Sequence, residues 1–584
     1  MDLPEGQNSN ITRGRDDLAS WLASQPDNYF QSDDGLSRGL RMLMGDTTYE
    51  DFHPALDRFG REAAGIDGAT RENNLHTNLP RLDSRDGIGR VQDRVTHHPS
   101  YHEVGRAIYG SGVMTSLGDS AYPNLKSLSL FYISSMNGEA GHNCPLACTA
   151  GIIKVLQHVA NDALREKYLP GLLDPDYETR LHGAQFLTEI QGGSDVGANA
   201  TTALPVEGSA DLYTLVGEKW FCSNIDADLT LMTARLDDPA KGTAGLGLFL
   251  LPLRATDGSP NGYRVWRLKD KLGTRSMASG EIELNGAPAH RIGDQQSGFR
   301  HMMRYVIHTS RLFNAMACLG NMRRATLVGV SYAQNRGAFG HKIANYPLVQ
   351  ETIADMRSDT AAARAATLRL LFQQDTLEVP SHEAAVDTAA QRMAVNLNKT
   401  ISARFAHEVI NQGIELLGGN GAIESFSVLP RLLRDNVVFE NWEGTHNTLL
   451  AQWLRDAKGR NMDTPFFAWL RGLLEALPTD GCLAPVRSGG LSTCDELEQS
   501  MLELRDMDDS VASLRMRVLG EKIGCLMYCA CLAAEAAYAR SASRDDAEDT
   551  EHLARYFYDR RVQPPSERHD AEYLNRLRTI NRCT

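Results

Sequence analysis

The stretch NWEGTHNTL, residues 441–449, contains the residue types of a general base. Glu443 is its single carboxylate, and it lies between the apolar ring of Trp442 and Gly444. A carboxylate in apolar, poorly hydrated surroundings becomes a stronger base. The same residues also fit an ordinary helix start. Asn441 can cap a helix that begins near Gly444, with Glu443 favourably placed by the helix dipole. Both interpretations stay open on this stretch alone.

A second stretch, FLTEIQGGSDVGANATTA at 186–203, contains a glycine-rich turn. The backbone N–H groups of residues 192–195 could cradle an anion such as a pyrophosphate, with the Ser194 hydroxyl as a further donor. Thr188 offers another hydroxyl just before the turn. Turns of this composition also occur without any ligand, so this stretch by itself does not decide between the two.

Two aromatic motifs could hold a flat cofactor. Trp220 lies in GEKWFCSN, residues 217–224, where a strand tryptophan is either a core residue or a stacking partner for a ring. Arg336 and Phe339 lie in QNRGAFG, where they form either a surface cation with a neighbouring ring or a clamp for a phosphate and a purine.

The stretch ELLGGNGAIE, residues 415–424, carries Gly418, Gly419 and Gly421. The G-x-G-x-x-G order is missing, and the glycines follow a helical pattern instead of a strand, so we do not expect a nicotinamide site. The tight backbone allows close approach by a ligand or a neighbouring subunit.

Periodicity divides the 584 residues into four segments. We expect a helical domain at 1–180, a small β domain at 181–295, a helical bundle at 296–460 and a helical extension at 461–584. LYTLVGEKWFCS, GLGLFLLPL and GEIELNGAPAH have strand-like composition, interrupted by Gly, Pro and Asn-Gly turn signals. A bundle-core stripe precedes the C-cap glycines Gly418 and Gly419; it consists of Leu397, Ile401, Phe405 and Val409.

The extension is expected to open with a loop containing Pro478, Gly481, Pro485 and Gly489-Gly490, and SASRDDAEDTEH to be a solvated loop. Residues 460–584 hold 16 Lys and Arg against 21 Asp and Glu, but seven arginines gather between Arg555 and Arg582. Surface arginines of an amphipathic helix or a DNA contact both fit this tail. The net charge of −14 disfavours indiscriminate polyanion binding.

The composition is that of a soluble, cytoplasmic protein with reduced cysteines. The start, MDLPEGQNSN, does not resemble a signal peptide, and we find no apolar run of about 20 residues that would span a membrane. Cys525, Cys529 and Cys531 have spacings that do not suit zinc, so we predict core thiols and no metal site.

Seven motifs, in this order along the chain, resemble the acyl-CoA dehydrogenase superfamily. They are LTEIQGGSD, KWFCSN, KLGTRS, SRLFNAM, NRGAFG, LLGGNGAIE and RLLRDNVVFENWEGTHN, and the resemblance covers roughly residues 100–458. Gln-Gly-Gly-Ser-Asp, the phrase RLKDKLGTRSMASGEIEL at 267–284, Trp-Glu-Gly and the C-terminal extension are similar to the AidB-like subgroup.

The resemblance implies a mainly helical fold in which a central β-barrel-like domain lies between an N-terminal helical domain and a C-terminal four-helix bundle. FAD would lie between the β domain and the bundle, each site of a homotetramer being built from two subunits, with Gly418 to Gly421 coming from the neighbour. The cofactor-binding residues so implied are Leu187, Thr188, Gly193, Ser194, Trp220, Phe221, Cys222, Ser223, Arg336, Phe339, Gly418, Gly419, Gly421, Trp442, Gly444, Thr445 and Asn447. Ser194, Arg311 and Trp442 would meet the acyl-CoA substrate.

In this family a carboxylate removes a proton from the carbon beside the thioester, and the β-hydrogen passes to the flavin as hydride. Glu443 has the family's position for that base. Some family members instead carry the base on a bundle helix, and this second position is here Ser310, just before Arg311. Cys222 departs from the family, which usually carries a hydroxyl residue there.

Three functions follow from the resemblance. The first is oxidation of an acyl-CoA in fatty acid metabolism. The second is an AidB-like association with DNA through the C-terminal extension, in the alkylation response and with weak or no dehydrogenation. The third is the binding and sequestering of a fatty acyl ligand. The acyl-chain length and the electron acceptor are not predicted.

Overall fold

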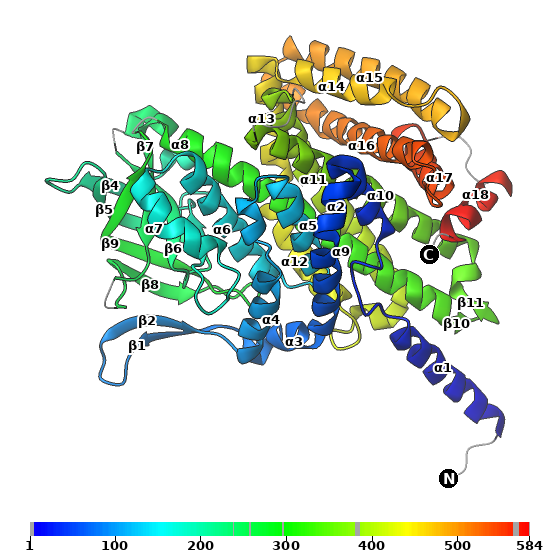
Figure 1. Cartoon of the computed structure of the whole chain (residues 1–584), viewed down its shortest axis with the longest axis horizontal. Coiled ribbons are helices and arrows are strands. Elements are labelled where there is room, and N and C mark those ends of the chain that lie inside the picture. Colours follow the sequence, from blue (N-terminus) through cyan, green and yellow to red (C-terminus); the bar gives the residue numbers. More distant parts are fainter. Residues whose placement is uncertain are drawn as a thin grey trace. The chain divides into compact units, whose positions relative to one another are not determined.

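The computed structural model describes residues 5–236, 239–255, 258–294, 297–379, 386–564 and 571–582. The chain forms two compact units. The first combines Met1–Ala64, Met136–Gly138 and Cys318–Thr584, and the second combines Gly65–Ser135 and Glu139–Ala317. Helices come first, strands follow and helices return (Figure 1), so the predicted fold class is confirmed. The boundaries of the four predicted segments stay a prediction.

The second unit contains a group of helices and a β domain. Its helices are α3 (Asp67–Asn73), α4 (Pro99–Gly110), α5 (Pro123–Ser135), α6 (Ala140–His158), α7 (Asp162–Leu173) and α8 (Gly298–His301). The hairpin is formed by β1 (Arg81–Arg85) and β2 (Val91–Thr96). The sheet contains β3 (Gly183–Phe186), β4 (Thr202–Pro205), β5 (Leu212–Ser223), β6 (Leu229–Arg235), β7 (Leu246–Pro252), β8 (Tyr263–Leu268) and β9 (Ser279–Ile292).

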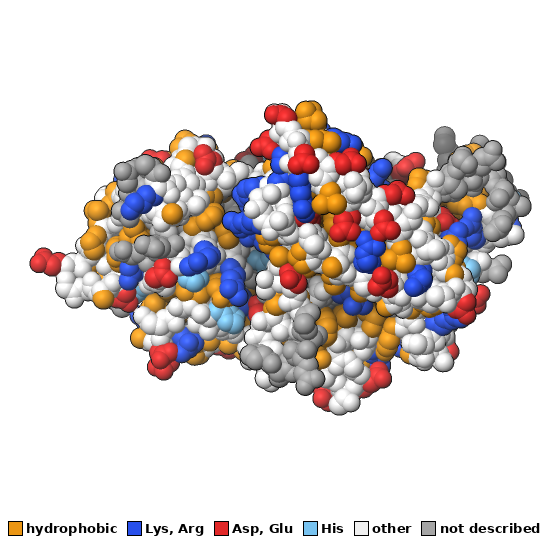
Figure 2. Space-filling model, turned by 90° about the horizontal axis from the view of Figure 1, so that it is seen from above, with side chains coloured by type: hydrophobic (Ala, Val, Ile, Leu, Met, Phe, Trp, Pro, Cys, Tyr) orange, Lys and Arg blue, Asp and Glu red, His pale blue; other side chains and the backbone are white. Residues whose placement is uncertain are grey.

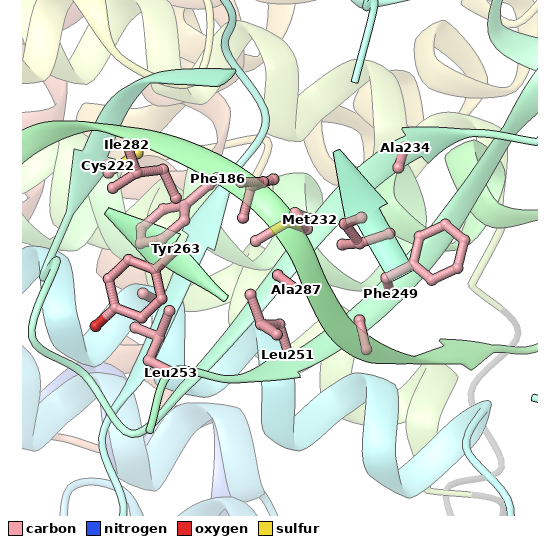
Figure 3. Packing of buried hydrophobic residues seen from close by; sticks show 14 of the residues in the cluster. Phe186, Cys222, Met232, Ala234, Phe249, Leu251, Leu253, Tyr263, Ile282 and Ala287 are labelled. Atoms are coloured by element: carbon pink, nitrogen blue, oxygen red, sulfur yellow. The ribbon is translucent and has the colours of Figure 1, made fainter. Parts of the chain in front are cut away.

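Strand pairing closes this sheet on itself. The strand order is β3-β6-β4-β5-β9-β7, and β7 pairs with β6 as well as with β9, while β8 adds to β9. The closed interior is filled by apolar side chains from several strands, among them Phe186, Met232, Phe249 and Ile282 (Figure 3). The three strand-like stretches of the sequence correspond to β5, β7 and β9.

One turn signal of the β domain proves to be a bulge. Leu215 of β5 pairs with Ala287 and Val216 pairs with Asn285, so Gly286 is the extra residue of β9. Its φ of 76° lies in the left-handed region that glycine tolerates. The expectation that Asn285-Gly286 breaks the strand is therefore wrong, because a bulge absorbs the glycine within a continuous strand.

The first unit is helical. Its N-terminal helices are α1 (Glu5–Ala23) and α2 (Asp34–Gly65), and its bundle helices are α9 (His308–Asn335), α10 (Pro347–Glu378), α11 (Thr388–Leu417), α12 (Leu429–Asn441) and α13 (His446–Arg460). The first residues of α9 belong to the second unit. The predicted stripe of α11 is buried, and Gly418 ends this helix at a φ of 59°, so both expectations are confirmed.

The extension is more helical than its composition indicated. It contains α14 (Asp463–Glu475), α15 (Ala484–Arg505), α16 (Asp509–Ser541), α17 (Ala547–Phe557) and α18 (Ala571–Arg582), with α14 and α15 alongside α16 (Figure 1). Gly489 and Gly490 lie inside α15 instead of in a loop. A Cβ at Gly489 would lie 1.7 Å from the Tyr558 hydroxyl, and one at Gly490 would lie 2.8 Å from Leu474. These glycines serve close packing. Only residues 542–546 of the predicted charged loop are non-helical.

Two arginines of the tail bind the extension to the bundle. Arg560 Nη1 and Arg561 Nη2 lie 2.7 and 2.6 Å from the carboxylate of Asp359, a fully buried residue of α10. Arg555 and Arg576 both pair with Asp559. The expectation of surface arginines is therefore corrected for Arg560 and Arg561. Arg555 and Arg576 are only half-buried, and Arg568 lies outside the described residues.

Nine cysteines lie in the described part of the chain and all are free thiols, eight of them buried. They include Cys525, Cys529 and Cys531 of α16, as predicted. No described helix is long and apolar enough to cross a membrane. No group of His, Cys, Asp and Glu in the described ranges has the arrangement of a metal site.

Candidate active site

The loop after β3 and the end of β5 lie side by side in the second unit. The Trp220 N–H donates to the Thr188 carbonyl at 2.9 Å, so two of the predicted cofactor-binding motifs share one edge. Asn199 Nδ2 donates to the Leu187 carbonyl at 2.8 Å and folds the loop back on itself. A Cβ at Gly193 would approach the Thr188 hydroxyl to 2.8 Å, so glycine there lets the turn pass close to that hydroxyl. Ser194 is exposed on the turn.

A buried ion pair holds this loop. Glu189 is 4% exposed and Lys219 is 1% exposed, and the Lys219 Nζ lies 2.7 Å from Glu189 Oε1. The Glu189 carboxylate also accepts from the N–H groups of Ala200 at 2.6 Å and Thr201 at 3.2 Å. Burial acts to raise the pKa of Glu189, but Lys219 and these N–H donors outweigh it and lower the pKa to about 2.

This pair was not among the predicted site residues. A signal was available, because Lys219 has the same parity in β5 as the buried residues Tyr213 and Leu215. A lysine in an inward-facing series needs a buried partner, and Glu189 is the acid of the neighbouring loop.

The four residues at the end of β5 face different surroundings. Lys269 Nζ lies 3.8 Å from the centre of the Trp220 ring and 2.6 Å from Glu281 Oε1, so one face of this ring is already covered. Phe221 is 55% exposed. The Ser223 hydroxyl lies 3.3 Å from the Ser279 hydroxyl.

Cys222 points into the β-domain core (Figure 3) and is fully buried. Burial raises the pKa of its thiol, which stays protonated. The Cys222 side chain thus faces the β-domain core, and the predicted contact of Cys222 with a cofactor stays a prediction that would involve its backbone. A register shift between Lys219 and Cys222 produces this orientation.

In the first unit, Glu443 lies in the turn between α12 and α13. Helix α12 ends at Asn441, whose side chain donates back to the Val437 carbonyl, and α13 begins at His446 with Thr445 as its N-cap. The expected cap at Asn441 is therefore wrong. Glu443 is half-buried and has a φ of 56°, a left-handed conformation that is costly for a residue other than glycine.

Neighbouring side chains support this turn. Trp442 stacks on Phe439 with ring centres 5.2 Å apart, and its indole Nε1 is buried with no hydrogen-bond partner among the described residues. The buried Lys399 of α11 donates to the Glu440 carbonyl at 3.0 Å and to the Gly444 carbonyl at 2.8 Å.

Glu440, the last glutamate before the turn, accepts from two histidines. His407 Nδ1 lies 2.8 Å and His446 Nε2 lies 3.4 Å from its carboxylate oxygens. Burial alone would raise the pKa of Glu440, but the hydrogen bonds from His446 and His407 lower it. Neither this cluster nor Lys399 was predicted, because both depend on contacts that α11 makes with α12 and with the residues that follow α12.

Asn447 lies in the first turn of α13, and the remaining predicted cofactor residues of the bundle lie near the ends of α9 and α11. Arg336 precedes a hairpin of β10 (Gly337–Ala338) and β11 (His341–Lys342), and Phe339 at its tip is 94% exposed. Asn420 Nδ2 donates to the Tyr332 hydroxyl at 3.4 Å, so the segment that carries Gly418, Gly419 and Gly421 lies near the C-terminal end of α9. Arg311 and Ser310 are buried on α9, in the part that belongs to the second unit.

A closed β domain that is preceded by helices and followed by a helical bundle along the chain is the architecture of the acyl-CoA dehydrogenases. Residues 184–287 match the middle domain of acyl-CoA dehydrogenase, and residues 296–457 match its C-terminal domain. Residues 23–179 match the N-terminal domain of the adaptive response protein AidB.

The chain belongs to the acyl-CoA dehydrogenase family, in its AidB-like subgroup. It is 33% identical over 450 residues to acyl-CoA dehydrogenase family member 11 of Caenorhabditis elegans, covering 74% of this chain and 71% of that protein. It is 30% identical to the putative acyl-CoA dehydrogenase AidB of Escherichia coli, covering 65% and 69%. The crystal structure of C. elegans ACDH-11 in complex with C11-CoA matches with a TM-score of 0.83 and 28% identity, covering 94% of each chain.

Proposed function

We propose that this protein is an FAD-dependent oxidoreductase that oxidises an acyl-CoA between its α- and β-carbons. The observation that carries the proposal is the Glu443 turn, in which a half-buried carboxylate is held in a costly left-handed conformation. Strained backbone of this kind persists where the surrounding contacts over-determine it, and it clusters at active sites.

The residues of the β domain fit a flavin. Thr188 would hydrogen-bond the flavin ring, and Ser194 would hydrogen-bond its pyrophosphate. Gly193 lets the turn pass close to Thr188, because a Cβ at that position would lie 2.8 Å from the Thr188 hydroxyl. Trp220 would pack against the isoalloxazine with the ring face that Lys269 leaves uncovered. FAD, when bound, supplies the acceptor for the hydride that leaves the β-carbon.

The bundle supplies the base and the second half of the cofactor site. Glu443 would take the α-proton onto its carboxylate, and the rings of Trp442 and Phe439 beside it would exclude water from that oxygen. Arg336 and the exposed Phe339 would contact the adenine side of the cofactor, and Gly418 to Gly421 would complete the flavin site of a neighbouring subunit in a homotetramer. We place the protein in the cytoplasm.

A titration under anaerobic conditions tests the proposal. The purified protein should contain FAD, and an acyl-CoA should bleach its absorbance near 450 nm. Glu443→Gln should retain FAD and lose the bleaching. Glu503→Gln, a change of the same kind at an exposed position of α15, is the matched control and should bleach like the wild type. A wild-type flavin that stays oxidised with short, branched and long acyl-CoAs would contradict the proposal.

A second candidate function is the binding of an acyl-CoA without turnover. The similarity that favours it is to ACDH-11, which was crystallised with C11-CoA and matches 94% of this chain. An acyl group of about this length is therefore the first to test. If mass spectrometry of the extracted protein finds a co-purifying acyl-CoA while the flavin stays oxidised, this function replaces the first.

An AidB-like association with DNA stays a prediction. The arginines of the tail give it little support, because Arg555, Arg560, Arg561 and Arg576 form ion pairs within the chain. On the face drawn in Figure 2, Lys and Arg side chains are interspersed with Asp and Glu. DNA affinity that falls steeply as salt rises would support the association, and a flat response would count against it.

A further inference from the structure

Lys399 joins the centre of the bundle to the turn that carries Glu443. It lies on α11 and is fully buried. Its ammonium donates to the Glu440 carbonyl at 3.0 Å and to the Gly444 carbonyl at 2.8 Å. These carbonyls lie on either side of Glu443, so one side chain fixes the backbone before and after the predicted base.

The first of these carbonyls is at the end of a helix. Glu440 is the last residue but one of α12, where carbonyl groups lack partners within the helix and the helix dipole is negative. A buried ammonium group there gives such a carbonyl a hydrogen-bond donor and offsets the negative end of the helix dipole. The second carbonyl belongs to Gly444, directly before the N-cap of α13. Lys399 thus connects the end of one helix with the start of the next.

The backbone between these two points is strained. Glu443 has a φ of 56° and Gly444 a φ of 106°. A non-glycine residue in the left-handed region relaxes unless contacts on both sides prevent it. Burying an ammonium group also costs free energy that an apolar side chain of similar size would not. The hydrogen bonds to the Glu440 and Gly444 carbonyls therefore explain why a lysine occupies this position.

Helix α11 itself is a firm support for this lysine. Two residues further along α11, Ile401 packs so closely on α16 that a Cβ at Gly524 would come within 2.5 Å of it. The C-terminal extension thus braces the helix from which Lys399 reaches the turn.

We propose that Lys399 is a positioning residue that holds the Glu443 carboxylate in its reactive place by fixing the carbonyls of Glu440 and Gly444. The inference deepens the proposed function and rests on it for the role of Glu443. Lys399 need not touch substrate or flavin for this role.

Two readouts on Lys399→Met test the inference. The first is amide hydrogen exchange of residues 440–447, which should become at least about tenfold faster, because two charge-assisted hydrogen bonds are lost. The second is the rate of flavin reduction by a saturating acyl-CoA, which should fall about 10- to 100-fold with little change in KM, as a misplaced catalytic group predicts. If Lys399→Met does not fold, Lys399→Gln, which keeps an N–H donor without the charge, replaces it.

Asn398→Ala is the matched control. It removes a buried polar group from the neighbouring position of α11, whose hydrogen bonds go to Thr367 and Tyr528 instead of to the turn. Exchange at 440–447 should stay within about twofold of the wild type in this variant. If Lys399→Met and Asn398→Ala change exchange at 440–447 equally, or if neither changes it, Lys399 does not position the turn.

The exchange readout separates this inference from the proposed function. Faster exchange at 440–447 in Lys399→Met, together with a wild-type flavin that no acyl-CoA reduces, would refute the dehydrogenase and keep Lys399 as the residue that holds the turn. Unchanged exchange and an unchanged reduction rate would leave the dehydrogenase intact and overturn the role of Lys399.

Discussion

The buried pair of Glu189 and Lys219 gives a quantitative prediction. Glu189→Gln keeps the shape of the side chain and removes its charge. The buried Lys219 ammonium then still donates to the Thr233 carbonyl, 2.9 Å away, but no longer has a carboxylate beside it. Both partners are almost completely buried, 4% and 1% exposed, so solvent screens their interaction little.

Removing one partner of such a pair costs about 3–5 kcal/mol, because the remaining charge is left buried. The amide oxygen of Gln still accepts from the N–H groups of Ala200 or Thr201, which places Glu189→Gln near the lower value. Glu189→Gln combined with Lys219→Met removes both charges and should be no less stable than either single variant, which corresponds to a coupling of about 3 kcal/mol or more.

Urea unfolding at pH 7, followed by circular dichroism, measures these free energies. Asp495→Asn breaks the exposed pair with Arg471 and serves as the control, with an expected loss of about 1 kcal/mol or less. Because the pair pins the loop that carries Thr188, Glu189→Gln should also weaken FAD binding about tenfold or more, measured by flavin fluorescence. If this variant unfolds within about 1 kcal/mol of the wild type, the pair does not hold the loop.

The contribution of Glu189 to the free energy of unfolding falls at acidic pH. The pKa of Glu189 is lowered to about 2 in the folded protein from an ordinary value of 4.5. Its charged form therefore stabilises the fold fully above pH 4.5, and this stabilisation is lost as the pH falls toward 2.

Two further predictions concern stability. Burial lowers the pKa of His142 from 6.5 to about 3, so the unfolded chain binds the extra proton and stability falls as pH drops below 6.5. Between pH 7 and pH 5 His142→Gln should lose about 2 kcal/mol less than the wild type in urea unfolding, and equal losses would contradict the assignment. Asp359→Asn leaves Arg560 and Arg561 without their shared buried carboxylate and should cost about 3–5 kcal/mol. Limited proteolysis should then cut the chain near residue 562, and unchanged resistance would show that the ion pairs do not dock the extension.

Elements with a regular pattern could be predicted from the sequence. The alternation of LYTLVGEKWFCS gave β5 at Leu212–Ser223, and the fourfold stripe from Leu397 to Val409 gave the buried face of α11. Both patterns arise from burial of one face, which sequence periodicity reports directly.

Local signals failed where tertiary contacts decide between equivalent choices. Asn441 and Thr445 are both capping residue types, but α12 extends to Asn441 and Thr445 caps α13. Gly489 looked like a loop residue, but the Tyr558 hydroxyl occupies the place of its Cβ within a helical contact. Glycine composition alone does not distinguish a turn from close packing.

The motifs of the candidate site could be predicted from the sequence, but the contacts that hold them in place could not. The order of the motifs indicated Glu443, Thr188 and Trp220, but not the side chains behind them. Lys219 and Lys399 come from elements remote in sequence from the residues that they hold. A buried lysine has no sequence signature apart from its position on an apolar face.

The absorbance of the flavin during anaerobic addition of C11-CoA tests the function most directly. For a dehydrogenase with Glu443 as its base, the band near 450 nm should bleach in the wild type and persist in Glu443→Gln, with FAD bound in both. Persistence of the band in both proteins would contradict acyl-CoA oxidation. Bleaching in both would contradict the role of Glu443.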